Sequence, residues 1–165
     1  MGQDRPRANA SSEAARLIAT LELSPHPEGG WFRRIHTGSV PVQRGDGAER
    51  PGLTVIHYLL EEGDRSAWHQ VASDEVWHHA GGSPIRLLQR APDSPVRETR
   101  LGPLPTDRPV AVVPAGHWQA AVCDGPWCLA TCAVGPGFDF ADFRLLRDTP
   151  PVPEWATVPG VPDLL

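Results

Sequence analysis

The feature that most constrains the fold is a series of short apolar segments separated by turn-forming residues. Nineteen prolines and sixteen glycines, about a fifth of the chain, interrupt the sequence without any low-complexity period. Short strands with a turn signal about every 8 to 12 residues are typical of β-barrels and β-sandwiches. The predicted strands span residues 31–36, 53–60, 66–71, 75–80, 85–89, 96–101, 110–113, 118–123 and 127–134, with a closing strand over 138–146.

One helix is predicted before the strands. Ser11 or Ser12 can cap it, because serine side chains accept hydrogen bonds from the first free amides of a helix. The apolar residues that follow recur at helical spacing, which predicts one buried stripe made of Ala14, Leu17, Ile18 and Leu21. Between the helix and the main strand series, residues 37–52 are rich in Gly, Pro and charged residues, and we expect a mobile loop there.

The chain is predicted to form one domain. Residues 1–10 are expected to be disordered, 11–147 to form an all-β domain with its short N-terminal helix, and 148–165 to form a Pro-rich surface wrap or arm. At 165 residues the chain is long enough to bury a core without disulfides or a structural metal. Large aromatic side chains that fill a barrel interior explain the six tryptophans more simply than a stacking platform does.

Composition and charge argue against several partners and locations. Fifteen basic residues stand against 20 acidic ones, and no basic run is long enough for a nucleic-acid footprint. No apolar stretch approaches the roughly 18 residues of a membrane-spanning helix, and the start lacks the apolar core of a signal peptide. An odd count of three cysteines favours reduced thiols, and with no CxxC pair a structural zinc site is not expected. We therefore expect a cytoplasmic protein with neither nucleic acid nor membrane as a partner.

Strand parity brings polar side chains together. Residues two apart on a strand point to the same face, so His69 and Val71 share one. A reversal through residues 72–74 then starts the next strand at Glu75, which can bring its carboxylate beside His69. The turn over residues 114–116 likewise aims Gln119 inward. One imidazole, one carboxylate and one amide are thus predicted to converge inside the barrel.

Two segments resemble the two motifs of the cupin superfamily, whose barrels commonly hold a divalent metal with three His and one Glu. They are residues 63–82, which contain His69 and Glu75, and residues 114–119. Three further blocks, 26–32, 74–78 and 136–143, resemble the signature of the Cupin_5 (DUF985) family. The likeness covers roughly residues 17–146. It implies a double-stranded β-helix, or jelly-roll, barrel of the sugar-epimerase type, and a homodimer.

The same resemblance bears on the metal. In the cupin frame, Val71 and Gln119 stand where two histidines would be. Divalent metals need three or four good N, O or S ligands, and loss of ligands weakens binding. We therefore expect no cofactor, with a divalent metal held by His69, Glu75 and Gln119 as the alternative and His79 as the nearest fourth ligand.

The retained residues favour acid–base chemistry on a small organic metabolite, of the isomerase, epimerase or cyclase kind. His69 and Glu75 are the predicted catalytic pair, because a carboxylate in an apolar barrel titrates above its ordinary range. Two alternatives are a metal-dependent cupin oxygenase and a non-catalytic ligand-binding protein. The predicted substrate-binding residues are Gln119, Trp31, His57, Trp68, Trp77, His79 and Trp118.

A few other residues have two interpretations. His57 lies in an apolar strand, and it is predicted to be either a hydrogen-bonded core residue or part of a pocket wall. His26 and Glu28 lie on a turn, where exposure is the default, while the family block suggests a pocket rim or a dimer contact. Asp139 and Asp142 are predicted to cap the closing turn.

Overall fold

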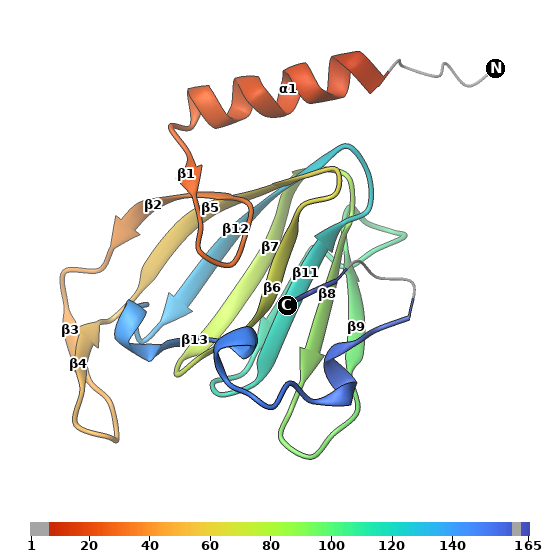
Figure 1. The fold of residues 1–165 in the computed structure, drawn as a ribbon. Helices are drawn as coiled ribbons and strands as arrows, with labels where there is room; N and C mark the ends of the chain where they lie inside the picture. Colours follow the sequence, from red (N-terminus) through yellow and green to blue (C-terminus); the bar gives the residue numbers. More distant parts are fainter. Residues whose placement is uncertain (1–6, 160–162) are drawn as a thin grey trace.

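A computed structural model describes residues 7–159 and 163–165. Two antiparallel sheets face each other, with strand orders β1-β2-β5-β12-β7-β10 and β13-β6-β11-β8-β9 (Figure 1). The elements are α1 (Arg7–Thr20), β1 (Ser24–Pro25), β2 (Trp31–Thr37), β3 (Pro41–Gln43), β4 (Glu49–Pro51), β5 (Thr54–Glu61), β6 (Arg65–Val71), β7 (Asp74–Gly82), β8 (Ile85–Arg90), β9 (Arg97–Leu101), β10 (Val110–Val113), β11 (Trp118–Cys123), β12 (Trp127–Gly135) and β13 (Phe143–Leu145). The prediction of an all-β domain with one short N-terminal helix is confirmed.

The core between the sheets follows the alternation of the strands. Tyr58 on β5 and Trp77 on β7 pack edge to face, with ring centroids 5.6 Å apart. Leu87 and Ala121 reach the same core from the opposite sheet and are fully buried. Because side chains alternate along a strand, each sheet contributes every second residue to this interior.

A second apolar cluster covers the outer face of the five-stranded sheet. Trp68 on β6 and Leu88 on β8 point away from the barrel interior and pack against the C-terminal segment. The Trp68 indole donates to the Ala156 carbonyl at 2.9 Å, and the Trp68 amide donates to the Leu164 carbonyl at 2.8 Å. The tail therefore wraps the surface of its own chain.

Three local predictions differ from the structure. The helix begins at Arg7 rather than at the predicted serine caps, because Arg and Ala at positions 7, 8 and 10 favour helix; residues 1–6 lie outside the described residues. Residues 37–52 include the β3–β4 hairpin. The closing strand is shorter than predicted, because a 3₁₀ turn over Phe140–Asp142 precedes it.

The hairpin and the closing turn are joined by ion pairs that are distant in sequence. The Asp142 carboxylate accepts from Arg44 and Arg50, each with a contact of 2.8 Å. Asp139 caps the 3₁₀ turn, as predicted, by accepting from the Ala141 amide at 2.8 Å. Asp142 makes ion pairs instead of a cap, so the segment before β13 is fixed by contacts that no local pattern predicts.

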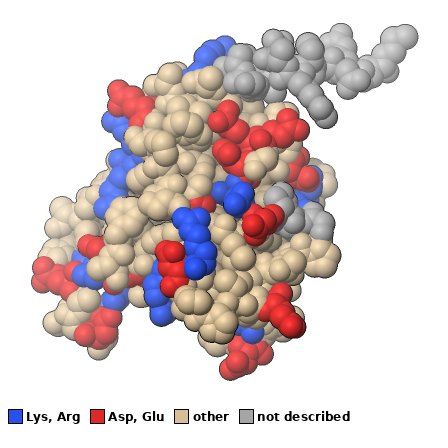
Figure 2. Space-filling view, viewed as in Figure 1, with Lys and Arg blue, Asp and Glu red and all other residues tan. Residues whose placement is uncertain are grey.

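Helix α1 lies across one end of the sandwich and contacts β5 and β12 (Figure 1). No helix among the described residues is long and apolar enough to cross a membrane. Basic and acidic side chains are interspersed over the face shown in Figure 2, without a large patch of one sign.

Candidate functional site

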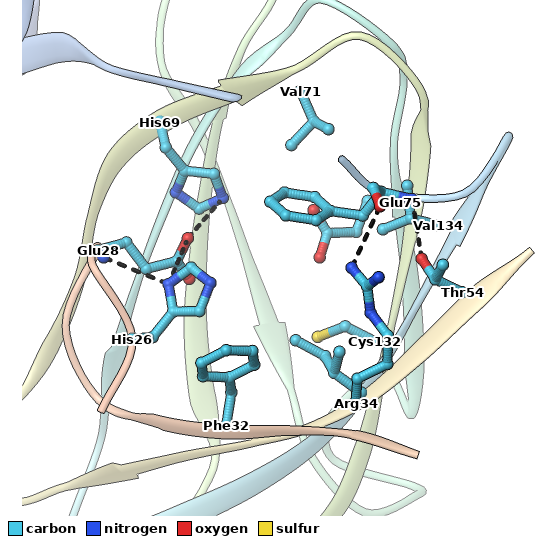
Figure 3. A pocket seen from close by; sticks show the side chains of 12 residues that line it. His26, Glu28, Phe32, Arg34, Thr54, His69, Val71, Glu75, Cys132 and Val134 are labelled. Carbon is cyan, nitrogen blue, oxygen red and sulfur yellow. Dashed lines mark hydrogen bonds and ion pairs between the residues drawn. The ribbon is translucent and has the colours of Figure 1, made fainter. Parts of the chain in front are cut away.

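A pocket opens between the two sheets (Figure 3). Its walls come from β2, β5, β6, β7 and β12, from the turn before β2 and from the segment before β13. The side chains that line it are His26, Glu28, Phe32, Arg34, Thr54, Ile56, His69, Val71, Glu75, Cys132, Val134 and Phe138.

Glu75 stands at the start of β7 and is 7% exposed. Its Oε2 accepts from the Gln119 amide nitrogen at 2.6 Å, and the Gln119 Oε1 accepts from the Trp77 indole at 2.8 Å. An indole N–H can only donate, so it fixes which end of the Gln119 amide faces Glu75. Burial, opposed by the nearby His69, raises the pKa of the Glu75 carboxyl to about 7. A group with this pKa exchanges protons readily at neutral pH.

His69 and Glu28 form a second titrating unit. The Nδ1 of His69 lies 2.8 Å from the Ala67 carbonyl, so Nδ1 carries a hydrogen and a neutral ring presents the Nε2 lone pair. That Nε2 lies 3.3 Å from Glu28 Oε2, and Ser66 donates to Glu28 Oε1 at 3.0 Å. Burial raises the pKa of Glu28 and lowers the pKa of His69, which favours a carboxylic acid facing a neutral imidazole. The two residues therefore share one proton.

A Gly-Gly turn explains how Glu28 comes to be buried. The His26 amide donates to the Gly30 carbonyl, and the Ala67 amide on β6 donates to the Glu28 carbonyl at 2.8 Å. Gly29 has φ +108°, and a Cβ added there would lie 2.1 Å from the Arg65 carbonyl oxygen. Only glycine allows this close approach to β6. The turn thus places the Glu28 side chain inside the barrel rather than at the exposed surface.

The titration of Glu75 predicts how stability depends on pH. The folded-state pKa of about 7 lies above the ordinary 4.5, so between these values the folded chain binds more protons than the unfolded chain. The contribution of this group is fully present below pH 4.5 and is lost as pH rises through 7, a fall in unfolding free energy of about 3 kcal/mol. Urea unfolding at pH 4.5 and pH 8 checks this. Glu75→Gln is expected to reduce that fall, whereas Glu62→Gln, at an exposed position, is expected to leave it unchanged. An equal fall in all three proteins would contradict it.

The structure places the predicted pair, His69 and Glu75, in the same pocket, on facing sheets. Val71 also lines the pocket, as parity predicts. Gln119 and Trp77 lie behind Glu75, 1% exposed, and do not line the pocket. The expectation that these two contact substrate is corrected. The Trp77 indole is hydrogen-bonded to the Gln119 amide oxygen, and the Gln119 amide nitrogen is hydrogen-bonded to Glu75.

The other predicted substrate-binding residues lie away from the pocket. Trp68 and Trp118 each neighbour an inward-facing residue and so point outward, where both pack near Trp155. Two more residues point away from the cavity, because side chains alternate along a strand and the adjacent residues Phe32 and Ile56 line the cavity. These are Trp31, which donates to Glu61 at 3.2 Å, and His57, whose buried Nδ1 has no hydrogen-bond partner among the residues that the structure describes.

His79 shares the face of Glu75 but lies further along β7, with Nε2 3.0 Å from the Ser83 carbonyl. In contrast, Arg34 lines the pocket and was not among the predicted site residues. His26 and Glu28 were predicted to be either exposed or at a pocket rim, and both line the pocket. Arg34 could have been found from strand parity with Phe32.

The residues at this site do not fit a metal set of three His and one Glu. Val71 supplies no donor atom, and the Gln119 amide does not line the cavity and has both ends hydrogen-bonded, its oxygen to Trp77 and its nitrogen to Glu75. Among the residues described, no group of three or more His, Cys, Asp or Glu side chains is placed to hold a metal ion. The predicted alternative of His69, Glu75 and Gln119 as ligands is therefore corrected for Gln119.

Comparison with known proteins identifies the class of this fold. A family model described as "Cupin superfamily (DUF985)" matches residues 15–146. The chain is thus a member of the cupin superfamily, and within it the chain belongs to the Cupin_5 family. The resemblance stated from the sequence, and the jelly-roll barrel that it implied, are confirmed.

Solved structures with similar folds agree with this family assignment. A hypothetical protein from Leishmania major is 28% identical with a TM-score of 0.75, over 79% of this chain and 85% of that one. A protein from Shewanella oneidensis is 29% identical with a TM-score of 0.73, over 80% and 83%. An oxalate decarboxylase from Lactobacillus farciminis, 16% identical with a TM-score of 0.57, is similar in fold alone, over 76% of this chain and 34% of that one. Comparison with curated proteins finds no match.

Proposed function

We propose that this protein catalyses proton transfer on a small organic molecule bound in the barrel pocket, in a reaction of the isomerase, epimerase or cyclase kind. The observation that carries the proposal is the placement of two titrating units on opposite walls of one cavity. Glu75 comes from the six-stranded sheet, and His69 comes from the five-stranded sheet with Glu28 beside it.

Such a pair can remove a proton on one side of a substrate and return one on the other. Ionised Glu75 takes a proton from a C–H or O–H bond, and the proton shared by Glu28 and His69 is delivered to the opposite face. No net proton is gained or lost, which suits isomerisation and epimerisation. The apolar remainder of the lining, including Ile56 and Val134, excludes water and keeps these groups near their shifted pKa values.

The same residues bear on the two alternatives, a metal-dependent oxygenase and a non-catalytic binding protein. A metal-dependent oxygenase needs a ligand set that Val71 and Gln119 do not supply, so we do not propose it. A pure binding protein would use Glu75 and His69 as hydrogen-bonding partners only. This second alternative is separated from the proposal by whether the bound molecule exchanges hydrogen.

The test is isotope exchange. Compounds that co-purify with the protein are identified by mass spectrometry, and each is incubated with the protein in D₂O. We expect at least one bound compound to gain deuterium at a single carbon, detected by loss of its proton NMR signal. Compounds that bind in the pocket but gain no deuterium after long incubation would contradict catalysis and support a binding protein.

A further inference from the structure

Arg34 places a positive charge at the mouth of the pocket. It lies on β2 two residues after Phe32, so both side chains face the cavity (Figure 3). Its Nη2 donates to the Phe138 carbonyl at 3.1 Å, and its guanidinium carbon lies 5.8 Å from the centre of the Phe138 ring. These contacts hold the guanidinium across the mouth while its other N–H groups remain open to a ligand.

This charge has no acidic partner among the residues that the structure describes. Its neighbour Arg33, on the opposite face of β2, pairs with Glu22. Arg44 and Arg50 pair with Asp142. Arg34, in contrast, makes no ion pair within the described part of the chain, although it lines a cavity with two carboxyl groups in its interior. An arginine at the rim of a cavity, without an acidic partner in the described part of the chain, is suited to bind an anion.

Thr54 supplies a second donor at the same place. It lines the pocket and is 1% exposed. Its Oγ1 accepts from the Phe138 amide at 2.9 Å, so the hydroxyl hydrogen is not used in that bond. Arg34 and Thr54 therefore hold the carbonyl and the amide of the same residue, Phe138, from two adjacent strands. Each side chain keeps at least one donor hydrogen that is not used in its bond to Phe138.

The surroundings favour a carboxylate over a phosphate. One cation matches the charge of a carboxylate, whereas a phosphate dianion needs more donors and more positive charge. Towards the interior, the aromatic and aliphatic side chains of Phe32, Ile56 and Val134 suit a short carbon skeleton. The acidic groups deeper in the pocket make a second anionic end unfavourable.

We infer that the ligand of this pocket is a small organic monocarboxylate, held at the mouth by Arg34 and Thr54, with its carbon skeleton directed towards Glu75 and His69. The reaction that follows rests on the function proposed above. The binding of the carboxylate does not, because Arg34 and Thr54 take no part in the proton transfer. The two claims can therefore fail separately.

The experiment compares acids with their amides. Isobutyrate and phenylacetate are titrated into the protein beside isobutyramide and phenylacetamide, with binding followed by ligand-observed NMR. We expect each acid to bind about tenfold or more tightly than its amide, because a hydrogen bond between two ionised groups is roughly twice as strong as one between neutral groups. Arg34→Gln is expected to abolish the difference, Arg34→Lys to retain part of it, and Arg33→Gln, on the other face of the strand, to leave it unchanged.

Several results would overturn the inference: equal binding of acids and amides, no binding of either acid, an unchanged preference in Arg34→Gln, or tighter binding of inorganic phosphate at the same site. Near-UV circular dichroism of Arg34→Gln controls for a displaced Phe138 segment. Glu75→Gln is expected to keep the preference for acids. Intact acid binding without isotope exchange would contradict the proposed function alone, and exchange on a neutral compound without any acid preference would contradict this inference alone.

Discussion

Replacing Glu75 with glutamine is expected to lower the rate of isotope exchange by about 100-fold or more, because a positioned general acid or base contributes on the order of 10² to 10⁴. The amide has nearly the same shape as the carboxyl, and its oxygen can still accept from Gln119. The loss should therefore come from the proton-transfer step, with ligand binding close to that of the native protein. The measurement is single-turnover deuterium uptake by a compound that exchanges in the native protein.

A matched control is Glu62→Gln, which removes an exposed carboxylate near the end of β5. It should leave the exchange rate unchanged. His69→Gln and Glu28→Gln are each expected to lower the rate as well, because the two residues share one proton across 3.3 Å. Exchange in Glu75→Gln within a few-fold of the native rate would remove Glu75 from the mechanism.

Replacing Trp68 with alanine is expected to destabilise the fold by about 3–5 kcal/mol, the usual cost of removing a large buried aromatic side chain. Trp68 is fully buried beneath the C-terminal segment, with its ring centroid 5.3 Å from that of Trp155. The variant also loses the indole bond to the Ala156 carbonyl. Urea unfolding at fixed pH measures the effect, and Trp155→Ala, at a half-buried position, should cost less.

Ligand binding gives the second readout for this variant. Because Trp68 faces away from the cavity, the folded fraction of Trp68→Ala should bind pocket ligands as the native protein does. A small change in stability together with a large loss of ligand affinity would contradict the structure, and would support the prediction from the sequence that Trp68 binds substrate.

The strand series and the inward parity of His69 and Val71 could be predicted because alternation is a local property of the chain. Residues 110–113 and 118–123 match β10 and β11. The β3–β4 hairpin could not be predicted in the same way, since Asp142 binds its two arginines from 92 and 98 residues away. Local composition there indicated only a loop.

The site was predicted in part for the same reason. The placement of His69 and Glu75 in one pocket follows from parity and one turn, but the burial of Glu28 depends on a turn packing against β6. The orientation of Gln119 depends on the Trp77 indole, which fixes the amide towards Glu75. Aromatic content indicated a lined pocket, yet parity assigns Trp68 and Trp118 to the outside. The homodimer stays a prediction.

The most direct test of the central claim is the pKa of Glu75 itself. With ¹³C-labelled glutamate, the side-chain carboxyl shift of Glu75 is followed from pH 3 to pH 9, and Glu75→Gln identifies its signal. We expect a midpoint near pH 7, because the carboxyl is buried at the wall of the pocket. A midpoint at or below the ordinary value of about 4.5 would show a permanently ionised group at neutral pH, and would contradict a buried Glu75 carboxyl that gains and loses its proton near neutral pH.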